Sequence, residues 1–407
     1  MSGKTCHIWP KSPKEIGGEI KVSFLVEPHR EKAFEIWFKI PEELKSAVSE
    51  RSDAFLTAAM FHLMSRNENA KVHGPITSSL LFGLHNYMSI WHRWNRDLYH
   101  VVDLDCEAEV TSPEADGDEA IALYSGGVDA SFTALRHARK SAGRFSRNLT
   151  TCLMVHGFNI SLDDQEHFEQ AFGLARESLE TLSLPLLSMQ TNWWHYAAST
   201  VKDTHSSGLA AFLSLFQKRF RVGLFGSTST YDYFDSWGSH PTCDIQFSSD
   251  AFEVISDDSA YSREDKVMEL MEWPTGLKNL RVCHHPINGQ NCRTCEKCLR
   301  TALCFMANGL EAPDCLKVDM TRKILENIQL YEPFKSDMVG RILKRAKEKG
   351  IRRPEFDILE KRYKRKMFRM HVRKYLEATR QTKVDQGLWK TLNDHPVIGK
   401  VIRKMTG

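Results

Sequence analysis

The chain has 407 residues, of which 42% are hydrophobic and 26% are charged, and its net charge is +3. This composition is close to that of average globular proteins, so it excludes disordered, collagen-like and coiled-coil classes, and the length predicts two or three domains. The net charge is too small to indicate nucleic-acid binding by itself.

The sequence contains no apolar run of the roughly eighteen residues that a membrane-spanning helix needs, and its first residues lack the apolar core of a signal peptide. We therefore expect a cytoplasmic protein with no membrane partner. In a reducing cytosol, the ten cysteines would be free thiols or metal ligands rather than disulfides.

Residues 1–111 predict a small α+β N-terminal domain. Apolar and polar residues alternate over 20–26 and 34–40, as in half-buried strands, whereas 54–64 and 78–94 have the spacing of helices. Trp91 and Trp94 are three positions apart and are expected to pack in the core from one helix face. An acidic stretch with Pro and Gly over 112–119 then predicts a linker.

Residues 119–310 predict an α/β domain built on a parallel sheet. Short apolar runs alternate here with helix-length segments, which is typical of strands joined by crossover helices. The expected strands are 120–124, 151–155, 184–189 and 221–225, and the expected helices are 130–140, 165–182 and 208–220. In such sheets, ligands bind at the carboxyl ends of the strands.

Residues 311–407 predict a basic helical C-terminal region, with Lys and Arg concentrated over 341–349 and 361–369. Such clusters are typical of a solvated helix face, and a surface for RNA, DNA or an acidic protein is the alternative.

The first expected strand of the α/β domain ends in the turn Ser125-Gly126-Gly127, directly before a helix. Paired glycines let a backbone approach a ligand, and the N–H groups of the turn and of the next helix can receive an anion such as a phosphate. Asp129 is placed to reach a magnesium ion held by that phosphate. The lysine and longer spacing of a Walker loop are absent, which disfavours a kinase or GTPase.

Four cysteines form a second cluster: Cys283, Cys292, Cys295 and Cys298. Two overlapping CxxC steps and a thiol upstream can close a tetrahedral shell, which predicts a structural Zn²⁺ site with no open position. An iron–sulfur cluster is the alternative, and His284 and His285 are candidate substitute ligands.

The string Ser125, Gly126, Gly127, Asp129 and Ser131 resembles the PP-loop of the N-type ATP pyrophosphatases, which cleave ATP between its α and β phosphates. Together with the cysteine spacing, it resembles the 7-cyano-7-deazaguanine synthase (QueC-like) family of queuosine biosynthesis over residues 119–310. That resemblance implies that ATP and Mg²⁺ contact these five residues, with Asp129 and Ser131 catalytic. The family has Ser directly after the Asp, where this chain has Ala130.

The resemblance carries further positions with it. Arg263 stands where the family has a lysine that touches the ATP phosphates, with Lys266 as the alternative cation, so Arg263 is expected to be catalytic. His156-Gly157 stands at a family Tyr-Gly step near the adenine. The stretch from Trp237 to Asp244 replaces a family segment associated with the deazaguanine, which makes His240 and Asp244 candidate substrate-binding residues.

The resemblance implies a ligase-like enzyme that activates a 7-carboxy-7-deazaguanine or a similar heterocyclic acid, for attack by ammonia or an amine, to give an amide or nitrile. The regions flanking 119–310 indicate a specialised paralogue. One alternative is a component of a bacterial antiviral (anti-phage) defence system that joins a deazaguanine to a partner protein. A PP-loop tRNA sulfur transferase that holds RNA with the basic tail, and a nucleotide-binding scaffold without turnover, are the others.

Overall fold

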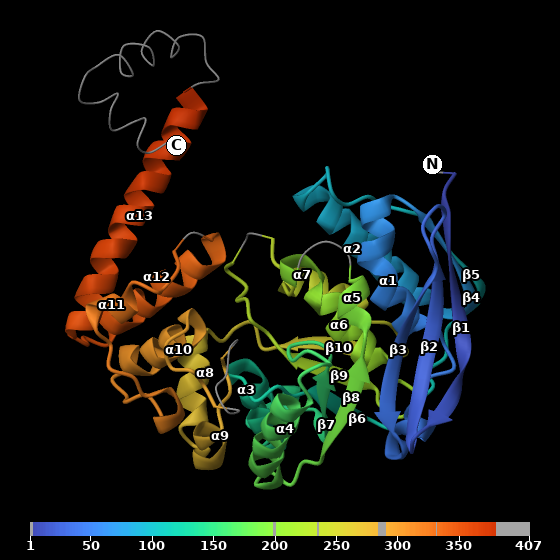
Figure 1. Ribbon diagram of the computed structural model, residues 1–407, viewed down its shortest axis with the longest axis horizontal. Coiled ribbons are helices and arrows are strands. Elements are labelled where there is room, and N and C mark those ends of the chain that lie inside the picture. The colour runs from blue at the N-terminus through green and yellow to red at the C-terminus, as the bar shows by residue number, and fades with distance from the viewer. Residues whose placement is uncertain (1–2, 198–200, 234–235, 284–289, 331, 380–407) are drawn as a thin grey trace. The chain divides into compact units, whose positions relative to one another are not determined.

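Ten strands form one sheet in the computed structural model, which describes residues 3–197, 201–233, 236–283, 290–330 and 332–379. The strand order is β10-β9-β6-β7-β8-β3-β2-β1-β4-β5 (Figure 1). Most neighbouring pairs are parallel; the antiparallel ones are β8 with β3, β3 with β2, and β2 with β1. The expected α/β class with a largely parallel sheet is confirmed.

The half of the sheet from β10 to β8 is entirely parallel and contains the expected strands. Its members are β6 (Glu119–Leu123), β7 (Asn148–His156), β8 (Leu186–Thr191), β9 (Val222–Gly226) and β10 (Glu253–Asp257). The helices between them are α3 (Val128–Ala138), α4 (Gln165–Glu180), α5 (Trp193–Tyr196), α6 (Val201–Ser214) and α7 (Pro241–Asp244). β10 was not expected from the sequence.

The other half of the sheet comes from the N-terminal region. Its strands are β1 (Thr5–Ile16), β2 (Glu19–Glu27), β3 (Phe34–Pro41), β4 (Asn69–Thr77) and β5 (Leu104–Val110), and its helices are α1 (Asp53–Arg66) and α2 (Ser78–Trp94). The strands β2 and β3 and both helices are confirmed. Trp91 is 1% exposed, which confirms its place in the core, and it packs edge-on against Trp94, which is partly buried against that core.

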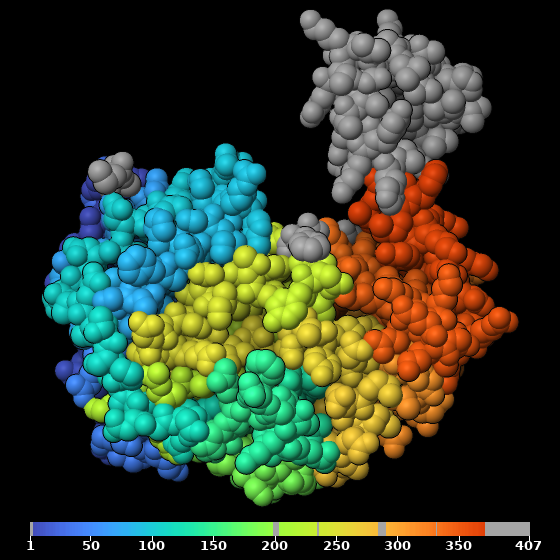
Figure 2. Space-filling view, turned by 180° about the vertical axis from the view of Figure 1, so that it is seen from behind, coloured from blue at the N-terminus to red at the C-terminus, as the bar shows by residue number. Residues whose placement is uncertain are grey.

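β3 joins the two halves by pairing with β8. The unpaired edge that β8 would otherwise present is thereby covered, which removes a site of non-specific association. The boundary expected near residue 111 therefore lies inside one continuous sheet. On the face drawn in Figure 2, the N-terminal residues (blue to cyan) directly border those of 240–280 (yellow). In the interior, the ring centroids of Tyr87 and Phe247 are 4.5 Å apart.

The chain divides into two compact units. Described residues of Met1–Arg293 and Pro313–Lys317 form unit 1, which contains the sheet, and those of Thr294–Ala312 and Val318–Gly407 form unit 2. Unit 1 also contains α8 (Arg263–Leu270) and α9 (Pro274–Lys278). The expected boundary at 310 lies within unit 2.

Unit 2 is helical, as expected for the C-terminal region. Its helices are α10 (Glu296–Ala307), α11 (Arg322–Leu325), α12 (Pro333–Glu348) and α13 (Pro354–Thr379). Several of its basic side chains are bound within the unit: Arg362 donates to the carbonyl oxygens of Leu325, Glu326 and Ile328, and Arg341 pairs with Asp337.

Candidate functional site

The strand order places a topological switch point at the carboxyl ends of β6 and β9. From β6 the chain crosses through α3 to β7 on one side, whereas β9, reached through α6, pairs with β6 on the other side. The loops that follow β6 and β9 therefore separate toward opposite faces of the sheet. In open α/β sheets this switch point is where ligands bind.

The turn after β6 has the backbone of an anion cradle. Gly126 has a φ of +74°, which a side chain would strain, and Gly127 is the extended N-cap of α3. No side chain of the described residues caps α3, and the first helical bond within it runs from Ser131 N–H to Gly127 O at 2.9 Å. The N–H groups of the first turn have no acceptor within the helix, and Gly127 N–H makes a long contact of 3.4 Å with Ser125 Oγ, so an anion at the start of α3 would satisfy them.

Gly226 at the end of β9 lies against the start of α3. A Cβ atom here would lie 2.4 Å from the carbonyl carbon of Asp129, which is part of the backbone and cannot move aside. The glycine therefore allows β9 to approach the start of α3 at van der Waals distance.

Two cations converge on Asp129 at this edge. Arg263 donates from Nη2 to Asp129 Oδ2 at 2.5 Å, and Lys266 Nζ lies 3.6 Å from Asp129 Oδ1. The capping box of Ser262 and Asp265 fixes the start of α8, which carries both cations. The two candidate cations named from the sequence thus both reach the predicted metal ligand.

Lys266 is 1% exposed and donates to Ser227 O at 2.6 Å and to Ser227 Oγ at 3.1 Å. Burial lowers the pKa of this ammonium group, and the Asp129 carboxylate opposes that effect. A positive charge is held in low dielectric beside the loop, where it acts most strongly on a bound anion.

A second charged group lies at the end of β10. Arg136 of α3 donates to Asp258 at 2.7 Å and to Asp257 at 3.3 Å. Burial alone would raise the pKa of Asp257, but hydrogen bonding and the charges of His137 and Arg136 hold it below its usual value. These carboxylates are neutralised inside unit 1, and they fix α3 against β10.

Arg281 connects the loop to the cysteine segment. Its N–H donates to Gly126 O at 2.8 Å, and its Nε donates to Ser125 O at 3.2 Å. Burial lowers the pKa of this guanidinium group. The turn that forms the anion cradle is therefore clamped by the residue two positions before the first cysteine of the cluster.

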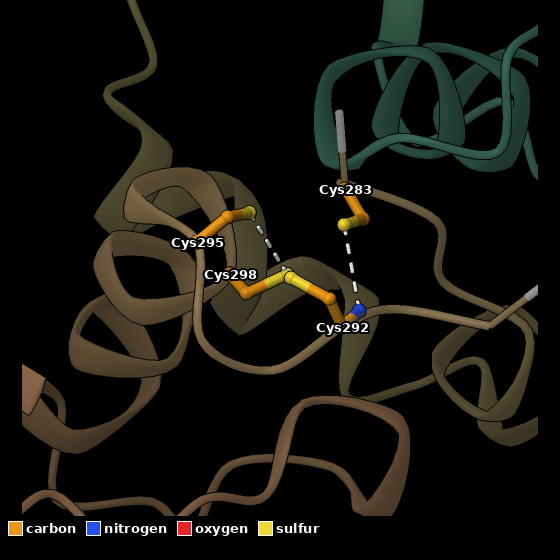
Figure 3. Close-up of side chains that lie close together, drawn as sticks. All are labelled: Cys283, Cys292, Cys295 and Cys298. Atoms are coloured by element: carbon orange, nitrogen blue, oxygen red, sulfur yellow. Dashed lines mark hydrogen bonds between the residues drawn. The ribbon is translucent and has the colours of Figure 1, made fainter. Parts of the chain in front are cut away.

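The four predicted metal ligands come together (Figure 3). One ligand atom from each of Cys283, Cys292, Cys295 and Cys298 lies within 4.8 Å of the others, so the cluster can hold a metal ion such as zinc. Cys292 N–H donates to Cys283 Sγ at 3.4 Å, and the Cys295 and Cys298 sulfurs are also 3.4 Å apart.

Local structure explains this convergence. Asn291 accepts from the N–H groups of Val282 and Cys283, which sets the first sulfur. Arg293 adopts a left-handed φ of +64°, which turns the chain between the second and third sulfurs. Four thiolates would fill a tetrahedral shell, which is typical of structural sites. His284 and His285 lie outside the described residues.

Other predicted site residues are buried in protein contacts. Ser131 is 0% exposed, and its hydroxyl lies 3.3 Å from the Tyr124 hydroxyl. His156 ends β7 at the same sheet edge, stacks on Phe168 and bonds through Nε2 to Ser161 O at 2.7 Å. Gly157 has a φ of +90°, and a Cβ there would meet Thr191 O.

The two candidate substrate residues lie at the ends of α7 and are buried. His240 bonds to Tyr233 O at 2.7 Å and caps α7 by accepting from Thr242 N–H. Asp244 is 1% exposed and accepts from Ser239 Oγ at 2.8 Å, while its Oδ1 has no hydrogen-bond partner among the described residues. Burial raises the pKa of Asp244 to about 7.

Sequence reasoning missed Gly226, Ser227 and Arg281. Gly226 ends an apolar strand and Ser227 begins a run of small polar residues after it, which was an available signal for a second loop at the sheet edge. Nothing local marks Arg281, because its role depends on a contact with a loop more than 150 positions away.

Comparisons with protein-family models, with curated proteins and with solved structures found no match to this chain. All ten cysteines are among the described residues, and none of them forms a disulfide there. Within the described part of the chain, no helix has the length and hydropathy needed to cross a membrane.

Proposed function

We propose that the chain is an ATP-dependent, adenylate-forming enzyme of the 7-cyano-7-deazaguanine synthase type. It would activate a 7-carboxy-7-deazaguanine or a similar heterocyclic carboxylate, with release of pyrophosphate. The observation that carries this function is the arrangement at the β6/β9 switch point: a glycine turn before an uncapped helix, with an aspartate and two cations beside it.

The donor set fits a nucleotide triphosphate. The N–H groups around Gly126 and Gly127 would bind phosphate oxygens, and Arg263 and Lys266 would neutralise their charge. Asp129 would exchange its ion pair with Arg263 for a magnesium ion, because a carboxylate is a preferred ligand of Mg²⁺. Ala130 lacks the hydroxyl of the family motif, and the backbone donors do not depend on that side chain.

The proposed chemistry explains why these charges are needed. An oxygen of the acid attacks the α-phosphorus, the bond to the β-phosphate oxygen breaks, and pyrophosphate leaves. The nitrogen of ammonia or an amine then attacks the activated carbonyl carbon, and AMP leaves with the original oxygen. Cations fixed beside the phosphates stabilise the negative charge that develops on the departing pyrophosphate.

A metal in the four-cysteine cluster would have a structural role here. It would fix the segment from Cys283 to Cys298, and Cys283 follows Arg281, which holds Ser125 and Gly126. The metal would thus keep the phosphate turn in shape without touching the reacting atoms.

Mass spectrometry of the products tests this function. The full chain is incubated with ATP, Mg²⁺, 7-carboxy-7-deazaguanine and ammonia, and pyrophosphate is measured in parallel. We expect pyrophosphate and the mass of the amide, or of the nitrile if a second ATP activates the amide oxygen and that oxygen leaves with a second AMP. Asp129→Ala should give neither product. Asp105→Ala is the control: it removes an exposed carboxylate of β5 that pairs with Lys71 of β4, and it should behave like the wild type.

If the wild-type protein releases no pyrophosphate with any deazaguanine acid, the proposed substrate class is wrong. If it binds ATP without turnover and retains a stable protein partner, a scaffold role replaces the enzymatic one.

A further inference from the structure

A second group of metal-ligating side chains lies in the N-terminal half of the sheet, away from the site described above. Cys6, His62 and Glu68 each offer one ligand atom, and these atoms lie within 4.8 Å of one another. All three residues are buried, with exposures of 0%, 5% and 5%. Buried Cys, His and Glu side chains seldom gather without a shared partner, since each carries polar or ionisable atoms.

The fold brings the three residues together from separate elements. Cys6 is on β1, His62 is near the end of α1, and Glu68 is in the turn between α1 and β4. Asn67 adopts a left-handed φ of +54° and reverses the chain after α1. The N–H of Asn69 then bonds to Lys4 O at 2.9 Å, which places Glu68 beside the start of β1.

The polar atoms of this group are poorly satisfied by the protein. His62 Nε2 is buried and has no hydrogen-bond partner among the described residues. Within that same part of the chain, Glu68 has no Lys or Arg within ion-pair distance, and its one contact to a donor is with His29 N–H at 3.3 Å. A buried carboxylate without a countercharge and an unpaired imidazole nitrogen both cost stability, and one divalent cation would relieve both.

We propose that Cys6, His62 and Glu68 bind a divalent transition-metal ion, Zn²⁺ in the first instance. A thiolate, an imidazole and a carboxylate favour zinc over Mg²⁺ or Ca²⁺, which prefer oxygen ligands. The thiolate and carboxylate charges together balance the ion. The His29 N–H bond to Glu68 holds the carboxylate in place, as outer partners do in metal sites.

Three protein ligands leave one position of a tetrahedral ion for water. The ion would join β1, α1 and the α1–β4 turn, so its role is to anchor the first strand of the sheet. In the metal-free protein, burial raises the pKa of the Cys6 thiol to about 12, so the ion must displace the thiol proton on binding.

Metal counting on the full chain tests this site. Protein that has been stripped with a chelator is reloaded with Zn²⁺, dialysed, and analysed for zinc per chain by inductively coupled plasma mass spectrometry. Cys6→Ser and Glu68→Gln should each bind one zinc equivalent less than the wild type. Cys152→Ser is the matched control, because Cys152 is an equally buried free thiol on β7 and belongs to neither ligand group.

Cobalt substitution separates this site from the four-cysteine cluster. In Cys295→Ser/Cys298→Ser protein, Co²⁺ should still give a thiolate charge-transfer band, and adding Cys6→Ser should abolish it. Equal zinc content in Cys6→Ser, Cys152→Ser and wild type would overturn the site, as would a cobalt band unaffected by Cys6→Ser. Far-ultraviolet circular dichroism checks that each variant is folded. If Cys6→Ser does not fold, the zinc content of Glu68→Gln decides the test.

Discussion

The two halves of the sheet differ in how their strands are covered and where their chains turn. In the parallel half, β6 is almost completely buried, because helices cover both faces. In the other half, β3 and β4 alternate between buried and partly exposed residues, because α1 and α2 cover one face only. The first pattern appears in the sequence as a continuous apolar run and the second as an alternation.

This difference determines where polar side chains from several strands can lie close together. Parallel strands end at a common edge, so the segments after β6, β9 and β10 bring Gly126, Asp129, Ser227 and Asp257 together. Antiparallel strands end at alternate edges, so the ends of β1, β2 and β3 bring together no comparable set among the described residues. The proposed zinc site in that half instead uses the helix–strand turn after α1.

The largest expected effect is on the parallel half. Asp129→Asn keeps the shape of the side chain but removes the charge that pairs with Arg263 and that is proposed to bind Mg²⁺. We expect turnover to fall at least about 100-fold, because the loss affects the stabilisation of the transition state. Steady-state pyrophosphate release measures this, and Asp105→Asn on β5 should stay within about twofold of the wild type. A similar loss of pyrophosphate release in both variants would show that the activity does not depend specifically on the parallel half of the sheet.

Gly226→Ala tests the close approach of β9 to α3. The new methyl group would lie 2.4 Å from backbone atoms of Asp129, so the strand or helix must shift. We expect a loss of about 3 kcal/mol in the free energy of unfolding, together with weaker ATP binding. Chemical denaturation and calorimetry measure both quantities.

Gly173→Ala is the matched control, since Gly173 lies within α4 and a Cβ there meets no atom within 4 Å. This change should stabilise the protein by about 0.5–1 kcal/mol. If Gly173→Ala is destabilised, or if Gly226→Ala has the same free energy of unfolding as the wild type, the described packing of β9 against α3 is wrong.

Asp244 gives a pH-dependent prediction. Its pKa is raised to about 7 in the folded protein by burial, from an ordinary value of 3.8, so the folded state binds the proton more tightly than the unfolded state. Its contribution to stability is fully present below about pH 4 and is lost as the pH rises through 7. Asp244→Asn removes this dependence.

At pH 8 we expect Asp244→Asn to be more stable than the wild type by about 1–2 kcal/mol, and at pH 4 to differ little from it. Thermal melting at both pH values checks the sign. A variant that is less stable at pH 8 would show that the ionised carboxylate is favoured in the fold.

The smallest expected effect concerns the clamp on the phosphate turn. Arg281→Met removes the Nε bond to Ser125 O but keeps the backbone bond to Gly126. One such bond contributes about 0.5–1.5 kcal/mol, so ATP affinity should fall about 2- to 10-fold. Arg139→Met removes a similar bond to a carbonyl, that of Glu272, and should leave the affinity unchanged. Equal ATP affinities in the two variants would show that the bond from the Arg281 side chain to the turn does not contribute to ATP binding.

Sequence patterns predicted the elements that have a pattern of their own. The apolar runs of β6 to β9 and the alternation of apolar and polar residues in β2 and β3 were sufficient to predict these strands. β5 and most of β1 are exposed, and Gly74-Pro75 interrupts β4, so these strands depend on pairing with neighbours rather than on their own composition. β10 is short and is flanked by Ser and Asp.

The same distinction holds for the sites. The four-cysteine cluster was predictable because its ligands are close in sequence and the chain between them is short. The contacts of Arg281 with the loop, of Gly226 with Asp129, and of Cys6 with His62 and Glu68 were not, because they arise only when distant elements pack. The loop itself was recognisable, whereas the burial of the Ser131 hydroxyl against Tyr124 required the fold.

The central claim is that the turn at Ser125–Gly127 supports cleavage of ATP between its α and β phosphates. The most direct measurement is to identify the nucleotide products from ATP in the presence of 7-carboxy-7-deazaguanine and ammonia, with wild-type and Asp129→Asn protein side by side. We predict AMP and pyrophosphate from the wild type and neither from the variant. ADP with inorganic phosphate, or equal amounts of AMP from both proteins, would contradict the account.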